Sequence, residues 1–309
     1  MNDELPEGAM DGTSPVTASR VTFEIARQLG LPLAPGLYLV ATPIGHLADM
    51  TLRAIAVLAH ADVVYCEDTR HSRTLLAHYA IRTPLRPYHE HNAEEQRPRV
   101  LKELADGRVV ALISDAGTPL VSDPGFKLVR EAASAGHAVT AVPGPSAALA
   151  ALTVSGLPTD AFFFAGFLPA KDGARKARIA ELSTIPATLL FFEAPTRVAD
   201  TVADLAAELG NREAAIAREL TKLYEDVRRA RLADLASEFA AAPPKGEVVI
   251  VVGPPERGEV SDAAIEASLA PMLESLSIRD ASRMVADTLK VPKGRVYDVA
   301  LGLKRRDRS

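Results

Sequence analysis

The sequence predicts an α/β protein with two α/β domains and a small helical module at the C-terminal end. Three observations support this prediction. The chain has 309 residues, of which 48% are apolar, so it is long enough to bury cores in more than one domain. Short β-rich apolar runs alternate with Ala- and Leu-rich segments over most of its length, as strands alternate with helices. Residues 260–309 show helical patterns only.

Residues 36–152 form the first predicted domain. Its strand candidates are LYLVA (37–41), VVYCE (63–67), VVALIS (109–114) and AVTAV (138–142), with helical segments such as TLRAIAVLAHA and FKLVREAASAG between them. Buried apolar strands separated by helices predict βαβ units and a parallel sheet covered on both faces. The preceding residues 1–35 are rich in small and polar side chains and are predicted to be a flexible leader, with a short helix near Phe23–Leu29.

Residues 153–255 form the second predicted domain, after a hinge around Thr153–Asp160. Its strand candidates are FFFAGF (162–167), TLLFFEA (188–194), AAIAREL (214–220) and EVVIVVG (247–253). Two intervening segments, ARKARIAELS and TRVADTVADLAAELG, are helical in pattern. GPPERGE (253–259) is predicted to be a linker. Three short helices are expected in the module at 260–309, and the turn VPKG between the last two has helix-turn-helix character.

The composition and charge of the chain limit the cellular compartment in which the protein is expected and the partners that it can bind. A single cysteine, Cys66, excludes an intramolecular disulfide framework, and no stretch approaches the length of a membrane span. The acidic, polar N-terminal residues are unlike a signal peptide, so a cytoplasmic protein is expected. The net charge is −5, but Ser275–Ser309 contain nine Lys or Arg and four Asp, which leaves −10 on the rest. Such a basic tail is either a solvated terminus or a contact for an anionic partner.

Four loops follow predicted strands and carry unusual chemistry: ATPIGHLAD (41–49), EDTRHSR (67–73), SDAGTPLVSDPG (114–125) and PGPSAALA (143–150). Ligands of parallel α/β sheets bind beyond the carboxyl ends of the strands. Each loop by itself can be an ordinary turn, because Asp, Pro and Gly form turns. Together they favour a cleft lined by peptide groups for a flat, polar ligand. Neither a dinucleotide-binding fingerprint nor a phosphate loop is present.

Eight motifs occur in order: ATPIGHLADMTLRA, EDTRHSRTLL, HEHN, LISDAGTPLVSDPG, VPGPSAALAAL, GFLP, FFEAPTR and RELTKLYE. In this order they resemble the RsmI family of small-subunit (16S) ribosomal RNA cytidine 2′-O-methyltransferases, in the tetrapyrrole methylase superfamily. The resemblance covers about residues 36–253, and the basic tail is similar to that family's C-terminal module. It implies S-adenosylmethionine in the cleft between the two domains, methylation of a cytidine 2′-hydroxyl, a small-subunit ribosomal RNA substrate, a homodimer and no metal.

The resemblance also implies which residues bind the cofactor. The family's cofactor contacts fall on Pro43, Ala116, Gly117, Thr118, Val121, Ser146, Ala147, Phe192 and Leu220, with Glu193 as an alternative to Phe192. Where the family has an Asp this chain has Thr118, and Asp115 is expected to supply the carboxylate. A carboxylate and carbonyl groups would complement the sulfonium and ammonium charges of the cofactor.

The catalytic group is less constrained, because methyl transfer depends mostly on positioning and on exclusion of water. A group that polarises or deprotonates the hydroxyl is expected among Asp68, Arg70, Glu193, Lys222 and Glu225, each of which can equally be a salt-bridge residue. His89 and His91 are expected to lie in a loop that holds RNA or borders the cleft, or in a structural turn, since no further metal-ligating cluster accompanies them. The basic run at Lys171, Arg175, Lys176 and Arg178 is either a solvated helix face or a phosphate contact.

Two other functions fit parts of the pattern. One is a tetrapyrrole C-methyltransferase of the same fold, for which a basic helical tail has no evident use. The other is a non-catalytic, ribosome-associated RNA-binding protein that has kept the fold. Binding of the cofactor separates the second alternative from an enzyme.

Overall fold

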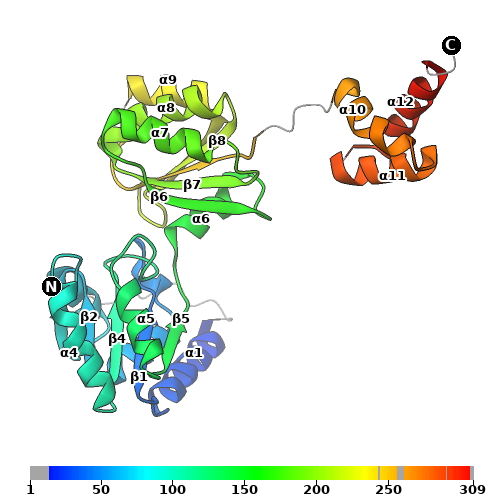
Figure 1. Ribbon diagram of the computed structural model, residues 1–309. Coiled ribbons are helices and arrows are strands. Elements are labelled where there is room, and N and C mark those ends of the chain that lie inside the picture. Colours follow the sequence, from blue (N-terminus) through cyan, green and yellow to red (C-terminus); the bar gives the residue numbers. More distant parts are fainter. Residues whose placement is uncertain (1–13, 243, 256–260, 290, 307–309) are drawn as a thin grey trace. The chain divides into compact units, whose positions relative to one another are not determined.

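The computed structural model describes residues 14–242, 244–255, 261–289 and 291–306. The chain divides into two compact units, residues 1–254 and 255–309. Within the described residues, the first unit contains two five-stranded sheets, and the second contains helices only (Figure 1). The α/β class and the helical C-terminal region predicted from the sequence are therefore confirmed. The division of residues 36–255 into two domains at residue 152 remains a prediction, although each sheet lies on its own side of that boundary.

The first sheet is entirely parallel, as predicted. Its strands are β1 (Gly36–Val40), β2 (Val63–Cys66), β3 (Leu85–Pro87), β4 (Val109–Ile113) and β5 (Val139–Val142), in the order β3-β2-β4-β1-β5. Val40 at the end of β1 pairs with Ile113 of β4 and with Val142 of β5. The carboxyl ends of these three strands therefore lie level at one edge of the sheet, where their loops leave together.

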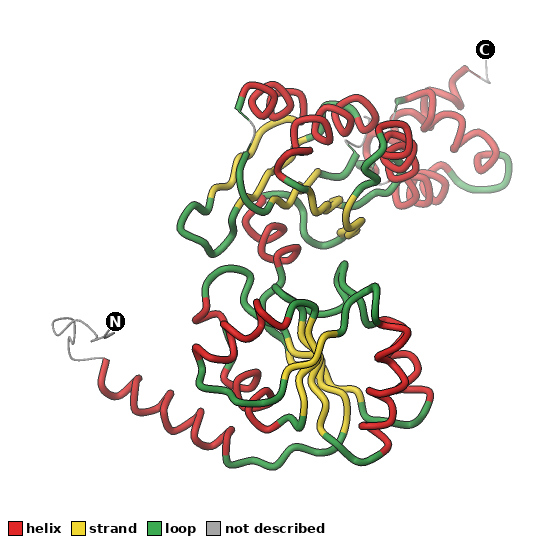
Figure 2. Tube along the Cα trace, turned by 90° about the vertical axis from the view of Figure 1, so that its left-hand side faces the viewer, coloured by secondary structure: helices red, strands yellow, loops and turns green. Residues whose placement is uncertain are grey.

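Helices cover both faces of the first sheet (Figure 2). Helices α2 (Leu52–His60) and α3 (Thr69–His78) pack on one face, against side chains such as Val40, Val64 and Ile113. Helices α4 (Ala93–Ala105) and α5 (Phe126–Ser134) pack on the other, against Leu37 and Leu112 among others. Successive strand residues thus point into opposite layers, which is why each strand is a continuous apolar run.

The predicted leader contains more structure than expected. Helix α1 spans Ser14–Leu29, and α1 contacts α2. The short helix expected near Phe23–Leu29 is therefore only the last part of a longer one. Residues 1–13 lie outside the described residues.

The second sheet is mixed. Its strands are β6 (Phe162–Phe167), β7 (Thr188–Glu193), β8 (Glu213–Arg218), β9 (Asp226–Arg231) and β10 (Val248–Val252), in the order β6-β7-β10-β8-β9. Strand β6 pairs with β7 in parallel, and the remaining pairs are antiparallel. Helices α7 (Asp172–Leu182), α8 (Val198–Leu209) and α9 (Leu232–Ala241) share one core with the sheet. Helix α6 (Ala147–Ser155) packs on the opposite face.

All eight strand candidates form strands, but β3 and β9 were not predicted. Strand β3 has only three residues, including Arg86 and Pro87, and lies at the edge of its sheet. Strand β9 has the sequence DVRRAR and lies at the edge of the second sheet. Edge strands expose much of their surface to solvent, so their sequences lack the apolar run that identifies a buried strand.

The second unit consists of α10 (Asp262–Leu273), α11 (Ile278–Leu289) and α12 (Lys293–Arg306), as predicted. Ile265, Leu269, Val285, Val296 and Ala300 meet in its own small core. The Ser261 hydroxyl caps α10 by accepting a hydrogen bond from the Ala264 amide. None of the helices in the described parts of the chain is both long and apolar enough to span a bilayer.

Candidate functional site

The loops that leave the first sheet are joined to one another by hydrogen bonds. Thr42 and Gly117 exchange backbone hydrogen bonds of 2.9 and 3.0 Å, which ties the loop after β1 to the loop after β4. The Thr118 hydroxyl donates to the Pro145 carbonyl over 3.0 Å, which adds the loop after β5. The Asp115 carboxylate accepts the Asp68 amide over 3.0 Å, which adds the loop after β2. The four loops singled out in the sequence therefore form one connected structure.

These loops form one wall of a cavity of about 450 Å³, a volume within the usual range of small-molecule sites. The opposite wall comes from residues of the second sheet and its loops, including Phe192, Ala217 and Val249. Ten residues predicted from the sequence line the cavity: Asp115, Ala116, Gly117, Thr118, Val121, Ser146, Ala147, Phe192, Glu193 and Leu220. Pro43 does not line it, but its neighbour Ile44 does. Their assignment to cofactor binding remains a prediction.

Unusual backbone conformations concentrate in the two loops that face each other across this cavity. On one side Leu120 and Ser122 have φ of 72° and 66°, on either side of Val121. On the other side Glu219 and Thr221 have φ of 51° and 65°, on either side of Leu220. Left-handed conformations are unfavourable for residues with a Cβ and occur preferentially at sites that hold ligands. In both loops they flank an apolar side chain that lines the cavity.

The loop after β1 also contacts the loop that holds Leu220. The His46 amide donates a 3.1 Å hydrogen bond to the Thr221 hydroxyl. A Cβ on Gly45 would lie 2.4 Å from Cγ of Lys222 and 2.7 Å from the Thr221 hydroxyl. A glycine is required at residue 45 because any side chain there would separate the two loops.

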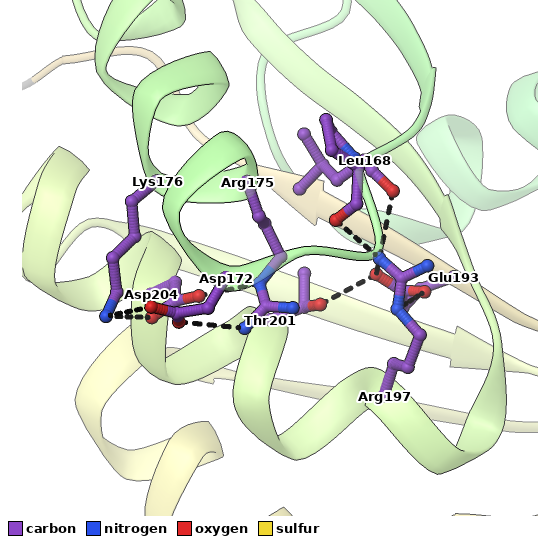
Figure 3. A network of polar contacts seen from close by, with 9 residues as sticks. Leu168, Asp172, Arg175, Lys176, Glu193, Arg197, Thr201 and Asp204 are labelled. Atoms are coloured by element: carbon purple, nitrogen blue, oxygen red, sulfur yellow. Dashed lines mark hydrogen bonds and ion pairs between the residues drawn. The ribbon is translucent and has the colours of Figure 1, made fainter.

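Glu193 lies at the end of β7 and has no exposed side-chain surface. It accepts hydrogen bonds from the Thr201 hydroxyl, at 2.7 Å, and from the Ala194 amide, at 2.8 Å. The Arg197 guanidinium lies 3.3 Å from the same carboxylate and also donates to the carbonyls of Leu168 and Pro169 (Figure 3). Glu193 therefore lines the cavity as a fully engaged carboxylate that holds the segments after β6 and β7 together.

The other four catalytic candidates are not among the residues that line the cavity. The Asp68 carboxylate caps α3 and pairs with Arg70, and the hydrogen bond from the Arg70 side chain lowers the pKa of Asp68 to about 2. Lys222 pairs with Glu219 at 3.0 Å and with Glu247 at 3.1 Å. Glu225 accepts a hydrogen bond from the Thr221 amide. These contacts give each side chain a part in loop structure, and any catalytic role for them remains a prediction.

Sequence reasoning missed one cavity residue with distinctive electrostatics. Asp123 lines the cavity, and burial raises its pKa to about 6, with further contributions from the charges of Glu67 and Asp115. A hydrogen bond with the Ser114 side chain opposes this effect. Asp123 belongs to the SDPG turn of a loop already singled out, but only the folded structure shows that it lines the cavity and is partly buried there.

Within the basic run after GFLP, Arg175 is not free to contact a phosphate, and a phosphate contact by the other residues of the run remains a prediction. The Arg175 side chain is buried, and its Nε lies 2.6 Å from the Asp204 carboxylate (Figure 3). Lys176 pairs with Asp172 and Asp204, and Arg178 pairs with Glu181. The helical period turns Arg175 toward α8, where a buried charge requires a partner.

His89 and His91 lie with their ring centroids 6.1 Å apart, and the His89 amide donates to the Asn92 side chain over 2.8 Å. Neither residue lines the cavity. The part of the chain that the structure describes contains no group of three or more His, Cys, Asp or Glu that could hold a metal ion. The two residues lie in the segment and turn that precede α4, and their role remains a prediction.

The sequence profile of the tetrapyrrole (corrin/porphyrin) methylases matches residues 36–236, about two thirds of the chain. The chain belongs to the tetrapyrrole methylase family. This confirms the family resemblance drawn from the eight ordered motifs. The matched residues include parts of both walls of the cavity, among them Phe192 on β7 and Leu220 in the loop after β8.

Among tetrapyrrole methylases, the chain is 52% identical to the ribosomal RNA small subunit methyltransferase I of Mesorhizobium japonicum. That match covers 88% of this chain and 94% of the relative. The chain is 45% identical to the protein of the same name from Xylella fastidiosa, over 85% of this chain and 98% of the relative. A solved structure, the uroporphyrin-III C-methyl transferase of Thermus thermophilus complexed with S-adenyl homocysteine, is 25% identical with a TM-score of 0.50. The structural match covers 71% of this chain and 97% of the Thermus thermophilus chain.

Proposed function

We propose that this chain transfers a methyl group from S-adenosylmethionine to the ribose 2′-hydroxyl of a cytidine in small-subunit ribosomal RNA. The observation that carries the proposal is the extent of the match to the relative from Mesorhizobium japonicum. The match covers 88% of the 309 residues, which is more than the 254 residues of the first unit. The similarity therefore extends into the helical unit. The tetrapyrrole enzyme from Thermus thermophilus matches a smaller share, 71%. The helical unit is therefore what favours an RNA substrate over a tetrapyrrole.

The residues of the cavity fit the proposed cofactor. S-adenosylmethionine supplies a methyl group bound to a positively charged sulfur. Apolar side chains such as Val121, Phe192 and Leu220 exclude water from the cavity. The carboxylate of Asp115 gives its wall a negative charge that complements a cation. The peptide groups of Ala116, Gly117 and Thr118 would hold the polar end of the cofactor. The chain's task is then to hold both reactants in line and to keep solvent out.

The RNA contact is proposed to lie on α12. Lys293, Tyr297 and Lys304 are exposed, and their spacing of four and seven residues places them on one face of the helix. A Cβ added at Gly294 or Gly302, on the same helix, would meet no atom within 4 Å, so the backbone there is open to close approach. Lysines bind phosphates, and an exposed tyrosine can stack on an unpaired base.

A homodimer and a cytoplasmic location complete the proposal. Leu149 and Val154 of α6 and Phe162 and Phe163 of the edge strand β6 are exposed apolar side chains, which are typical of interfaces when they are contiguous. Sedimentation velocity should give the mass of a dimer, and a monomer at micromolar concentration would contradict this part of the proposal. The cytoplasm follows from the proposed substrate, the small ribosomal subunit.

The decisive experiment incubates the protein with labelled cofactor and undermethylated small subunits, followed by nucleoside mapping. We expect the label in 2′-O-methylcytidine. Label on a base, or no label on RNA, would overturn the proposal. A uroporphyrinoid acceptor in a parallel reaction tests the tetrapyrrole alternative, for which the label would move to that acceptor. Calorimetry with the cofactor tests the non-catalytic alternative, for which no binding heat is expected.

A further inference from the structure

Asp123 is held in a rigid part of the loop after β4. Ser122, just before it, has φ of 66°, and Pro124, just after it, has its φ fixed by the ring. Gly125 has φ of 134°, and a Cβ there would lie 3.0 Å from the Leu112 side chain. These restrictions limit the backbone around Asp123, which lines the cavity.

The partners of Asp123 differ from those of the other cavity carboxylates. In the described part of the chain, Glu193 pairs with Arg197, Glu247 pairs with Lys222, and Asp115 accepts the Asp68 amide. Asp123 has the Ser114 side chain as its hydrogen-bond partner, and the charged groups that act on it, Glu67 and Asp115, are both acidic. Among these four cavity carboxylates, Asp123 is therefore the one that receives the least stabilisation from a positive charge or a backbone amide.

A carboxylate in this environment binds a proton more tightly than an ordinary aspartate. Its raised pKa of about 6 leaves it mostly ionised at pH 7 and still basic enough to accept a proton. Proton acceptors are most effective when their pKa lies near the working pH. The engaged carboxylates of Glu193 and Glu247 are poor candidates, because protonation would break their ion pairs.

We infer that Asp123 accepts the proton of the acceptor hydroxyl during methyl transfer, an inference that rests on the proposed function. The ribose oxygen forms a bond to the methyl carbon while the carbon–sulfur bond breaks and its electron pair stays on sulfur. The O–H bond breaks at the same time, and its proton passes to the Asp123 carboxylate. Solvent then removes this proton after the product leaves, and the carboxylate is restored.

The test compares Asp123→Asn with wild type by initial rates from pH 5 to 9 and by calorimetry with the cofactor. Asn keeps the shape of the side chain but cannot accept the proton. We expect cofactor affinity to change little, kcat to fall by about 10²–10⁴-fold, and the acidic limb of the wild-type profile near pH 6 to disappear. Cofactor affinity that falls by the same factor as kcat would identify Asp123 as a cofactor contact instead and overturn the inference.

Glu67→Gln is the matched variant. Glu67 is exposed and does not line the cavity, yet its charge helps to raise the pKa of Asp123. We expect the acidic limb to move to lower pH while the rate at pH 8 stays the same. Carbon NMR follows the titration of the carboxyl groups without any turnover, and the resonance that is present in wild type but missing from Asp123→Asn belongs to Asp123. In Glu67→Gln this resonance should titrate at a lower pH, as the acidic limb does. If Glu67→Gln moves neither the acidic limb of the rate profile nor the titration of the Asp123 carboxyl, the inference is overturned.

The wild-type reaction separates this inference from the proposed function. If wild type labels RNA and Asp123→Asn keeps its rate and profile, only the role of Asp123 is wrong. If wild type labels no RNA, the proposed function is wrong, and the inference fails with it.

Discussion

Thr42 and Gly117 exchange two backbone hydrogen bonds, of 2.9 and 3.0 Å, although they follow different strands of the first sheet. Gly117 reaches this position with φ of 81°, in the left-handed region. A Cβ there would lie 3.3 Å from the Ile44 side chain, which lines the cavity. The backbone of residue 117 therefore connects two loops and shapes the cavity wall.

Gly117→Val should lower both stability and cofactor affinity. A residue with a Cβ pays about 1–2 kcal/mol in the left-handed region, and the valine would also displace Ile44. Gly107→Val is the control, because Gly107 has φ of 75° and no atoms within 4 Å of its Cβ position. Urea denaturation should show a loss for both variants, whereas calorimetry should show weaker cofactor binding for Gly117→Val alone. Equal binding by the two variants would place the cofactor elsewhere.

Ser146→Trp should block cofactor binding while the protein stays folded. Ser146 lines the cavity and caps α6, since its hydroxyl accepts the Leu149 amide at 3.5 Å. Ser146→Ala removes only the cap, at a cost of about 1 kcal/mol. We expect Ser146→Ala to bind the cofactor and Ser146→Trp not to bind it. Cofactor binding that is unchanged in the tryptophan variant would show that the cavity is not the site.

Glu193→Gln should act mainly on stability. The variant keeps the hydrogen bond with Thr201 but leaves Arg197 without its anionic partner, and hydrogen bonds to charged groups contribute about 1.5–3 kcal/mol. Denaturation in urea should show a loss of this size, and the pH dependence of kcat should keep its shape. A normal stability with a changed pH profile would assign Glu193 the catalytic role instead.

Asp123→Asn should stabilise the protein at alkaline pH. The folded-state pKa of about 6 lies above the reference value of 3.8, so ionisation of Asp123 opposes folding. This penalty is absent below about pH 4, grows between the two pKa values, and is complete above pH 6. The melting temperature of the variant should therefore exceed that of wild type at pH 8 and match it at pH 4. A difference that is the same at both pH values would argue against the raised pKa.

The double variant Lys293→Gln with Lys304→Gln should bind small-subunit RNA more weakly. Removal of two phosphate contacts should make the slope of log affinity against log salt shallower by about 1.4–1.8. Lys102→Gln with Arg178→Gln is the control, since it changes the net charge equally but removes side chains that pair with Asp106 and Glu181. Filter binding over a range of salt concentrations measures both slopes. Equal slopes would exclude α12 as the RNA contact.

Much of the fold follows from local sequence. The runs LYLVA and VVALIS are apolar throughout because both faces of the first sheet are covered, so each strand can be recognised by itself. The four loops with Asp, Pro and Gly could be placed at one edge because parallel strands end at the same edge. The family could be recognised because eight motifs occur in one order.

The tertiary structure decided what depends on neighbours distant in the sequence. The polar edge strand Asp226–Arg231 is a strand only because β8 supplies its hydrogen bonds. Arg175 is part of a basic run in the sequence, but it is buried against Asp204, 29 residues away. Asp123 looks like a turn residue, and its raised pKa comes from burial and from Glu67, which lies in the loop after another strand. A sequence pattern reports the burial of its own segment, whereas the electrostatics of a side chain depend on every group that the fold brings near it.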